Sequence, residues 1–206
     1  MDLATTPDQH APNHHAGHTG FSGPTGVLAA LILMVGRTAD AELACRLSRA
    51  GAGDTVIDIG CGPGVAARHA AALGATVIGV DPAPVMVRFA KLLTRGRRVR
   101  YLAGAAESVP VGDGAATVAW SLSTLHHWAD IDAGLAEVRR AVAPGGRFVA
   151  LEKLIRQGAT GLASHGWTRG QADTFADQLA QTGFVDVAVD VHHGRRTTLS
   201  VRGIRV

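Results

Sequence analysis

The segment that most constrains the fold is a short apolar run followed at once by glycines. Residues 55–59 read TVIDI and residues 60–64 read GCGPG. A β-branched run of this length is typical of a strand buried on both faces. Glycines directly after it let the chain turn tightly and let a ligand approach the backbone. The segment therefore predicts the first strand of a parallel sheet, with a binding turn at its carboxyl end.

Helical and strand-like segments alternate after this turn. We expect helices over residues 65–73, 82–94, 131–142 and 171–182, and further strands over residues 76–80, 98–103, 116–121, 147–153, 184–191 and 197–206. A strand followed by a helix recurs, which predicts an α/β fold, a three-layer Rossmann-like sandwich with a mostly parallel seven-stranded sheet. No helix can be assigned between the third and fourth strands. The last two strands also lack a helix between them, so they are predicted to be antiparallel neighbours, with the last strand antiparallel.

The chain is expected to form a single domain behind a histidine-rich leader. Its 206 residues suit one domain with a sizeable core. Residues 1–25 hold four histidines among prolines and glycines, and few apolar groups, so they predict a flexible leader. Residues 26–206 are assigned to the domain. Within it, residues 26–50 are expected to form N-terminal helices or a lid, broken near Thr38 or Asp40, and residues 51–206 the Rossmann-like core.

Composition argues against several partners and locations. The formal net charge is +3 and the basic residues are scattered, which gives no nucleic-acid footprint. The longest apolar run, residues 27–35, is about half of the ~20 residues needed to span a bilayer. Cys45 and Cys61 cannot make a disulfide framework, which favours a reducing, cytoplasmic location. The sequence leaves the oligomeric state undefined, and a homodimer stays open.

Three residues around the turn indicate the kind of nucleotide. Asp81 ends the second predicted strand, about 20 residues after the first glycine, where a carboxylate can bind ribose hydroxyls. A dinucleotide fingerprint needs Gly-x-Gly-x-x-Gly to hold a pyrophosphate. Here Gly64 comes one place early and Pro63 lacks a backbone N–H donor. The pattern favours an adenosyl cofactor without phosphates.

These segments resemble the class I S-adenosylmethionine (SAM)-dependent methyltransferases, especially the broad group that acts on small molecules. The resemblance is carried by VIDIGCGPG at residues 56–64, Val80-Asp81-Pro82, residues 104–110, SLSTLHHW at residues 121–128 and residues 142–147. It is strong over residues 51–153 and rests on topology elsewhere. It implies that the chain uses SAM to methylate a small-molecule acceptor.

The resemblance also implies a cofactor site at the carboxyl ends of the strands. Gly60 and Gly62 would flank the methionine part of SAM, and Asp58 would fix the turn and the amino group. Many family members have an aspartate where this chain has Ala105, so the adenine would depend on backbone groups and apolar contacts. The predicted cofactor-binding residues are Asp58, Gly60, Cys61, Gly62, Gly64, Asp81, Pro82, Ala105, Ala106 and Ser121.

The candidate catalytic residue is one of two adjacent histidines. His126 and His127 follow the fourth predicted strand, at the edge where the methyl group is expected. Histidine titrates near neutral pH, which suits the removal of a proton from an acceptor. We predict that His126 is the general base. The alternative is a polar turn ahead of a helix that Asp130 or Asp132 caps, since positioning alone can serve methyl transfer.

The histidines near the N-terminus give a weaker signal. His10, His14 and His18 recur every four residues, as zinc ligands on a helix would. Because Pro12 and Gly17 interrupt that helix, no metal site is predicted. His14 and His18, together with His15, are candidates for a lid over the cofactor instead.

The acceptor pocket is expected to have one wall in residues 158–170, which include His165 and Trp167. Trp167 could stack on an aromatic acceptor, but we favour the interpretation that it fills an apolar gap.

Two other functions stay open on the sequence. A non-catalytic SAM-binding or scaffolding protein would retain the same sheet, and the alanine at position 105 is compatible with it. A nicotinamide-dependent oxidoreductase is disfavoured by the early third glycine.

Overall fold

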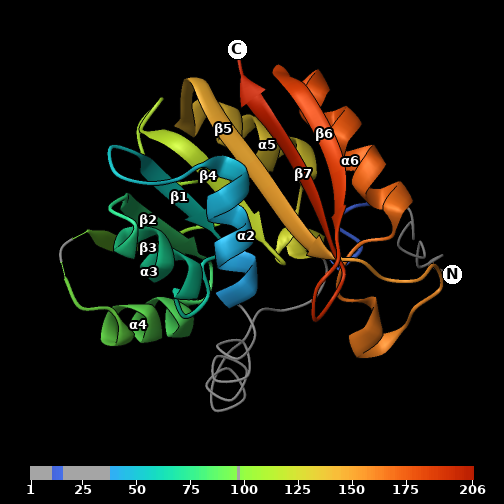
Figure 1. The fold of residues 1–206 in the computed structure, drawn as a ribbon, viewed down its shortest axis with the longest axis horizontal. Helices are drawn as coiled ribbons and strands as arrows, with labels where there is room; N and C mark the ends of the chain where they lie inside the picture. The colour runs from blue at the N-terminus through green and yellow to red at the C-terminus, as the bar shows by residue number, and fades with distance from the viewer. Residues whose placement is uncertain (1–10, 16–37, 97) are drawn as a thin grey trace, which may run out of the picture.

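The computed structural model describes residues 11–15, 38–96 and 98–206. Within them, one seven-stranded sheet has the order β3-β2-β1-β4-β5-β7-β6 (Figure 1). β1 to β5 pair in parallel, whereas β7 runs antiparallel to both of its neighbours, β5 and β6. The strands are β1 (Thr55–Ile59), β2 (Thr76–Asp81), β3 (Val99–Ala103), β4 (Ala116–Leu122), β5 (Val142–Lys153), β6 (Phe184–His192) and β7 (Thr198–Arg205). The predicted sheet, with its antiparallel last strand, is confirmed.

Helices cover both faces of the sheet. α2, α3 and α4 contribute to one apolar cluster, and α5 and α6 to the other. The helices are α2 (Thr38–Ser48), α3 (Val65–Ala72), α4 (Pro84–Leu93), α5 (Ile131–Ala141) and α6 (Arg169–Gln181), with short 3-10 turns η1 (Leu125–His127) and η2 (Gly161–Ser164). This three-layer arrangement confirms the predicted fold class. None of the helices in the described ranges is long and apolar enough to cross a bilayer, and the apolar run 27–35 lies outside those ranges.

The apolar run of β1 explains its central place. Val56 belongs to the cluster under α2, α3 and α4, whereas Ile57 and Ile59 belong to the cluster under α5 and α6. Successive side chains of a strand point to opposite faces, so a central strand covered by helices on both sides must be apolar throughout. Asp58 breaks this pattern. It is 2% exposed, and a buried carboxyl in an otherwise apolar strand needs a specific role.

The topology brings the ends of three strands together. Ile59 of β1 pairs with Ser121 of β4, and Leu122 of β4 pairs with Leu151 of β5. Strand order reverses between β1 and β4, which is where open α/β sheets bind ligands. The glycine turn after β1, the segment after β4 and the end of β5 therefore share one edge. As expected, residues 104–115 connect β3 to β4 without a helix.

Residues 11–15, which we call the N-terminal strap, lie against the same edge. The indole Nε1 of Trp167 donates to the carbonyl of Pro12 at 2.7 Å. Asn13 Nδ2 donates to the carbonyl of Trp128 at 3.1 Å, and the His15 backbone N–H donates to the carbonyl of His126 at 2.9 Å. This part of the predicted leader is therefore held to the domain. The remainder of the leader, with His10 and His18, and residues 26–37 lie outside the described ranges.

Candidate functional site

The glycine turn is a tight loop bonded to the end of β2. The backbone N–H groups of Gly60 and Cys61 donate to the carbonyl of Val80 at 2.8 and 3.0 Å. Gly60, Gly62 and Gly64 have φ values of +74°, +51° and +79°, a region that side chains other than glycine rarely adopt. The turn that the sequence predicted after β1 is confirmed, and it requires glycine for backbone reasons at three positions.

The three glycines nevertheless differ in what surrounds them. A Cβ at Gly60 would lie 2.5 Å from the hydroxyl of Thr124, and one at Gly64 would lie 2.2 Å from the hydroxyl of Tyr101. A Cβ at Gly62 would meet no atom within 4 Å. Close packing therefore requires Gly60 and Gly64, whereas Gly62 leaves its backbone open to a ligand.

Asp81 connects the turn to the second strand. Its carboxylate accepts hydrogen bonds from the backbone N–H groups of Gly62 at 2.8 Å and Ala83 at 2.9 Å. The residue is 7% exposed. A carboxylate oxygen can accept more than one hydrogen bond, so this role in the turn is compatible with the predicted contact to a ribose.

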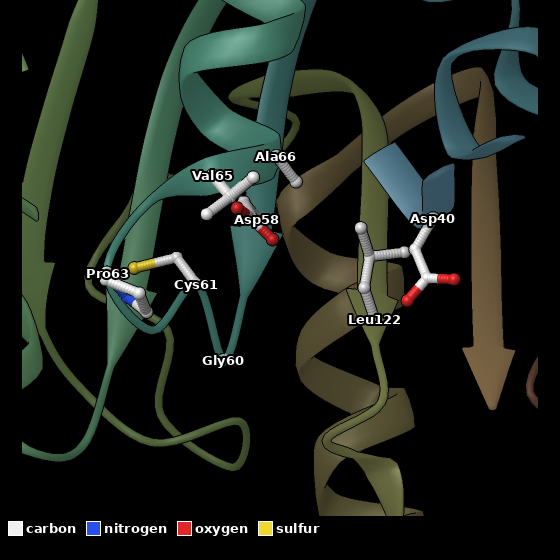
Figure 2. Close-up of a pocket in the computed structure, with 8 residues that line it drawn as sticks. All are labelled: Asp40, Asp58, Gly60, Cys61, Pro63, Val65, Ala66 and Leu122. Carbon is white, nitrogen blue, oxygen red and sulfur yellow. The ribbon is translucent and has the colours of Figure 1, made fainter. Parts of the chain in front are cut away.

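A small cavity lies between the glycine turn and the neighbouring elements. Figure 2 places Asp58 and Cys61 on one side of it and Asp40 and Leu122 on the other. The lining residues are Asp40, Asp58, Gly60, Cys61, Pro63, Val65, Ala66 and Leu122. Three of these, Asp58, Gly60 and Cys61, belong to the predicted cofactor set. Ser121 is buried, and the next residue of β4, Leu122, lines the cavity in its place.

The other predicted cofactor residues gather at the ends of β2 and β3. The backbone N–H of Gly104 donates to the carbonyl of Asp81 at 3.2 Å, which brings Ala105 beside the end of β2. Pro82 is exposed and Ala106 is buried. These residues occupy the edge where the sequence placed the adenine.

Cys61 carries a buried thiol within the glycine turn. Burial raises its pKa well above the ordinary value, and the negative charges of Asp58 and Asp81 raise it further. The thiol therefore stays protonated at neutral pH, and it contributes to the cavity as a small apolar group.

Thr124 connects the turn to the segment after β4. Its hydroxyl lies 2.7 Å from the hydroxyl of Ser121 and 3.3 Å from the carbonyl of Ile59. Gly60 packs on the same side chain. The position of η1 is therefore coupled to the position of the glycine turn.

His126, the predicted base, forms a buried pair with Glu152. Its Nδ1 lies 3.0 Å from both carboxylate oxygens, and the two residues are 3% and 0% exposed. Glu152 also accepts the backbone N–H of Leu125 at 2.9 Å. Because the carboxylate accepts the Nδ1 hydrogen, the lone pair of the neutral imidazole is on Nε2. Sequence analysis missed Glu152, although an acidic residue at the end of an apolar strand was a signal for it.

The alternative to a catalytic His126 was a polar turn before a capped helix. Asp130 does cap α5, since its Oδ1 accepts the backbone N–H of Ala133 at 3.0 Å. His126 itself is buried and not solvated, so the cap and the histidine are separate features.

Four more histidines surround His126. The ring centroids of His127, His165, His15 and His14 lie 4.2, 5.4, 5.7 and 6.1 Å from the centroid of His126. We call these five residues the histidine cluster. Burial, together with the neighbouring His126, His165 and His15, lowers the pKa of His127 to about 3, so His127 is neutral near pH 7.

Trp167 is two positions after His165 of the histidine cluster. It is fully buried, and its ring centroid lies 5.0 Å from that of Phe175. The interpretation that it fills an apolar gap is confirmed. Stacking on an acceptor is not available to a side chain with no exposed surface.

Comparison with known proteins finds similarity to methyltransferases. Residues 57–150 match a family model described as a methyltransferase domain. The chain is 34% identical over 145 residues to a ubiquinone biosynthesis O-methyltransferase of Methylobacterium nodulans, covering 65% of the chain and 58% of that protein. It is 41% identical over 81 residues to a demethylmenaquinone methyltransferase of Thermus thermophilus, covering 38% of the chain and 37% of that protein. The chain thus spans less than two thirds of these curated relatives.

The fold agrees with that of a solved SAM-dependent methyltransferase. A SAM-dependent methyltransferase from Aquifex aeolicus superposes with a TM-score of 0.72 at 17% identity, covering 87% of this chain and 98% of that one. Residues 57–150 thus match a methyltransferase domain, and the chain has the fold of a SAM-dependent methyltransferase.

Proposed function

We propose that this protein transfers the methyl group of SAM to a hydroxyl of a small-molecule acceptor, with His126 as the general base. The observation that carries the proposal is the buried pair of His126 and Glu152, on the edge of the sheet that also bears the glycine turn. The names of the curated relatives, which include O-methyltransferases of ubiquinone biosynthesis, support an oxygen acceptor.

The residues present fit the cofactor. The open side of Gly62 and the buried carboxyl of Asp58 suit the methionine part of SAM, whose amino group is positively charged. Asp81 would hold the ribose hydroxyls, and Pro82 with Ala105 and Ala106 would border the adenine. When bound, SAM supplies the electrophilic methyl carbon. The protein then has to align the acceptor, exclude water and remove one proton from the acceptor.

His126 is suited to accept the proton of the acceptor. Glu152 holds the Nδ1–H, which orients the ring and favours the positive charge that develops when Nε2 takes a proton. In the reaction, the acceptor O–H proton moves to Nε2, the C–O bond forms, and the C–S bond breaks to leave S-adenosylhomocysteine. Glu152 is a positioning residue here, because it acts through His126.

The test begins with binding. Calorimetry with SAM, S-adenosylhomocysteine and NAD should give binding of the first two and none of NAD. Methyl transfer from labelled SAM is then measured with a panel of phenols, catechols and hydroxylated quinones. Turnover of at least one acceptor supports the proposal. SAM binding without turnover of any acceptor would favour the non-catalytic SAM-binding protein, and preference for NAD would favour the oxidoreductase.

Variants then test the base. His126→Ala and His126→Gln should lower kcat by about 10² to 10⁴, the range typical of general bases, while the Kd for SAM stays close to the wild-type value. The matched control is His193→Ala, because His193 is exposed in the turn between β6 and β7, and it should retain the wild-type kcat. Unchanged turnover in both His126 variants would remove the residue from the mechanism.

A further inference from the structure

Three side chains of the histidine cluster are close enough to share a ligand. His126, His127 and His165 each offer a ring nitrogen, and these three nitrogens lie within 4.8 Å of one another. His126 and His127 belong to η1, and His165 directly follows η2. In the sequence, α5 and β5 lie between η1 and η2. Among the residues that the structure describes, this is the group whose donor atoms could surround one metal ion.

The spacing of the rings agrees with tetrahedral coordination. Zinc–imidazole bonds are about 2.0–2.1 Å, which puts ring centroids about 3.2 Å from the metal and about 5.2 Å from each other in a tetrahedral site. The centroid of His165 lies 5.4 Å from the centroids of both His126 and His127. The centroids of His126 and His127 are closer, at 4.2 Å, so one of these two rings would have to move outward when an ion binds.

The surroundings supply the outer-sphere contacts that metal-binding histidines use. Such a histidine donates its other ring N–H to a carboxylate or a backbone carbonyl. Glu152 accepts from Nδ1 of His126, which leaves Nε2 to donate its lone pair. The ring of His127 hydrogen-bonds the backbone of His15. Two of the three rings therefore have a second polar partner elsewhere in the chain.

The strap packs over this group. His15 Nε2 lies 3.1 Å from the hydroxyl of Ser164, and His14 Nε2 lies 2.9 Å from the carbonyl of the same serine. The ring of His15 stacks on His165 with a centroid distance of 4.6 Å. These contacts position the loop that carries His165 against η1.

We propose that His126, His127 and His165 form a binding site for a divalent transition-metal ion of the zinc class. Three neutral imidazoles without a thiolate suit zinc, cobalt or nickel, and they do not suit magnesium or calcium, which prefer oxygen ligands. Three protein ligands leave a fourth position for water or for a hydroxyl of the acceptor, as in catalytic zinc sites. The sequence predicted no metal site, because its zinc candidates were the N-terminal histidines.

A bound ion would change how the acceptor loses its proton. In the metal-free protein, Nε2 of His126 is the proton acceptor proposed above. With the ion bound, that nitrogen coordinates the metal, and the metal lowers the pKa of the oxygen that occupies its fourth position. The proposed site does not depend on the proposed function, since metal binding is measured without SAM or an acceptor.

The experiment is a titration of the chelator-treated full chain with Co²⁺, which replaces zinc and reports tetrahedral coordination by its visible d–d absorption. We expect one Co²⁺ per chain, an intense tetrahedral spectrum and displacement by one equivalent of Zn²⁺. His127→Ala and His165→Ala should each abolish the tetrahedral spectrum, and Glu152→Gln should weaken binding by about 10- to 100-fold. His193→Ala is the control and should bind like the wild type.

Several outcomes would overturn the site. Absence of a tetrahedral spectrum in the wild type would do so directly. A spectrum that survives in both His127→Ala and His165→Ala, while circular dichroism shows folded protein, would assign the metal to histidines elsewhere in the chain. If an alanine variant does not fold, the asparagine variant at the same position, His165→Asn or His127→Asn, replaces it. That variant must also lose the tetrahedral spectrum, because asparagine fills similar space without an imidazole nitrogen.

Discussion

His126 donates its Nδ1 hydrogen to Glu152, although the two residues come from different elements and lie 26 positions apart. Nδ1 is 3.0 Å from each carboxylate oxygen, and Glu152 has no exposed surface. The carboxylate also anchors the first residue of η1 through the backbone N–H of Leu125. One acidic side chain therefore sets both the tautomer of the histidine and the position of the turn that carries it.

Glu152→Gln should lower kcat by about 10²-fold, the lower part of the range for general-base effects, and should leave the Kd for SAM unchanged. Glutamine keeps an oxygen for the Leu125 N–H but removes the charge that favours protonation of His126. The measurement is kcat against pH, together with calorimetry for SAM. The matched control is Glu42→Gln, an exposed residue of α2. A wild-type pH profile with wild-type kcat would leave Glu152 as an anchor of η1 alone.

Gly60→Ala should destabilise the protein far more than Gly62→Ala. Both residues have positive φ, which costs an alanine about 1–2 kcal/mol. Only at Gly60 would the new Cβ lie 2.5 Å from the Thr124 side chain. We expect a loss of about 3 kcal/mol or more at Gly60, because steric overlap adds to the strain, and about 1 kcal/mol at Gly62.

Urea unfolding of the two glycine variants measures this difference. The double variant Gly60→Ala with Thr124→Ala should recover part of the loss, with a coupling energy of about 1–2 kcal/mol, since the two sites are in contact. Equal losses at Gly60 and Gly62 would contradict the packing that we describe. Gly62→Ala should instead weaken SAM binding, because it fills the open side of the turn.

The two cysteines should resist alkylation in the folded protein. Burial, together with the negative charge of Asp58, raises the pKa of Cys45 from 9.0 to about 11. The thiolate fraction at pH 8 is then about 100-fold smaller than for an exposed thiol, and the thiolate is the reactive form. The rate of reaction with iodoacetamide at pH 8 should therefore rise at least 100-fold on unfolding in urea. Prompt modification of either cysteine in the native protein would contradict this environment.

The same shift predicts how stability depends on alkaline pH. The unfolded thiol ionises near pH 9, and the folded thiol of Cys45 ionises near pH 11. Between these values the unfolded state binds fewer protons than the folded state, so stability falls as pH rises. Cys45→Ala should flatten the fall in unfolding free energy between pH 9 and 11. Parallel curves for the variant and the wild type would show that the thiol does not contribute.

Trp167→Phe should destabilise the protein more than Trp120→Phe. Both indoles are fully buried, so both variants lose similar packing. The indole N–H of Trp167 donates to the carbonyl of Pro12 in the strap, whereas the N–H of Trp120 has no hydrogen-bond partner within the described part of the chain. We expect an additional loss of about 1 kcal/mol for Trp167→Phe, measured by urea unfolding. Equal losses would indicate that the strap contributes nothing to stability.

Local patterns in the sequence were sufficient for the sheet and for the binding turn. The β-branched run 55–59 and the glycines after it specify a buried strand with a turn at its end, because both depend on backbone preferences of neighbouring residues. The absence of a helical segment between residues 184–191 and 197–206 specified the antiparallel pair, since a parallel pair needs a long crossover. Asp81 could be placed for the same reason, as it ends the adjacent strand.

The tertiary structure decided which side chains meet at that edge. Glu152 reaches His126 because β4 and β5 are neighbours in the sheet, and His165 reaches His127 because the loop after β5 folds back under the strap. No periodicity connects these positions, so the sequence pattern could single out His126 but not its carboxylate or its companions. The sequence by itself determined a mostly parallel sheet with a glycine turn at the end of its first strand. The pairing and clustering of the histidines depend on long-range packing of buried side chains, which only the folded chain brings within contact.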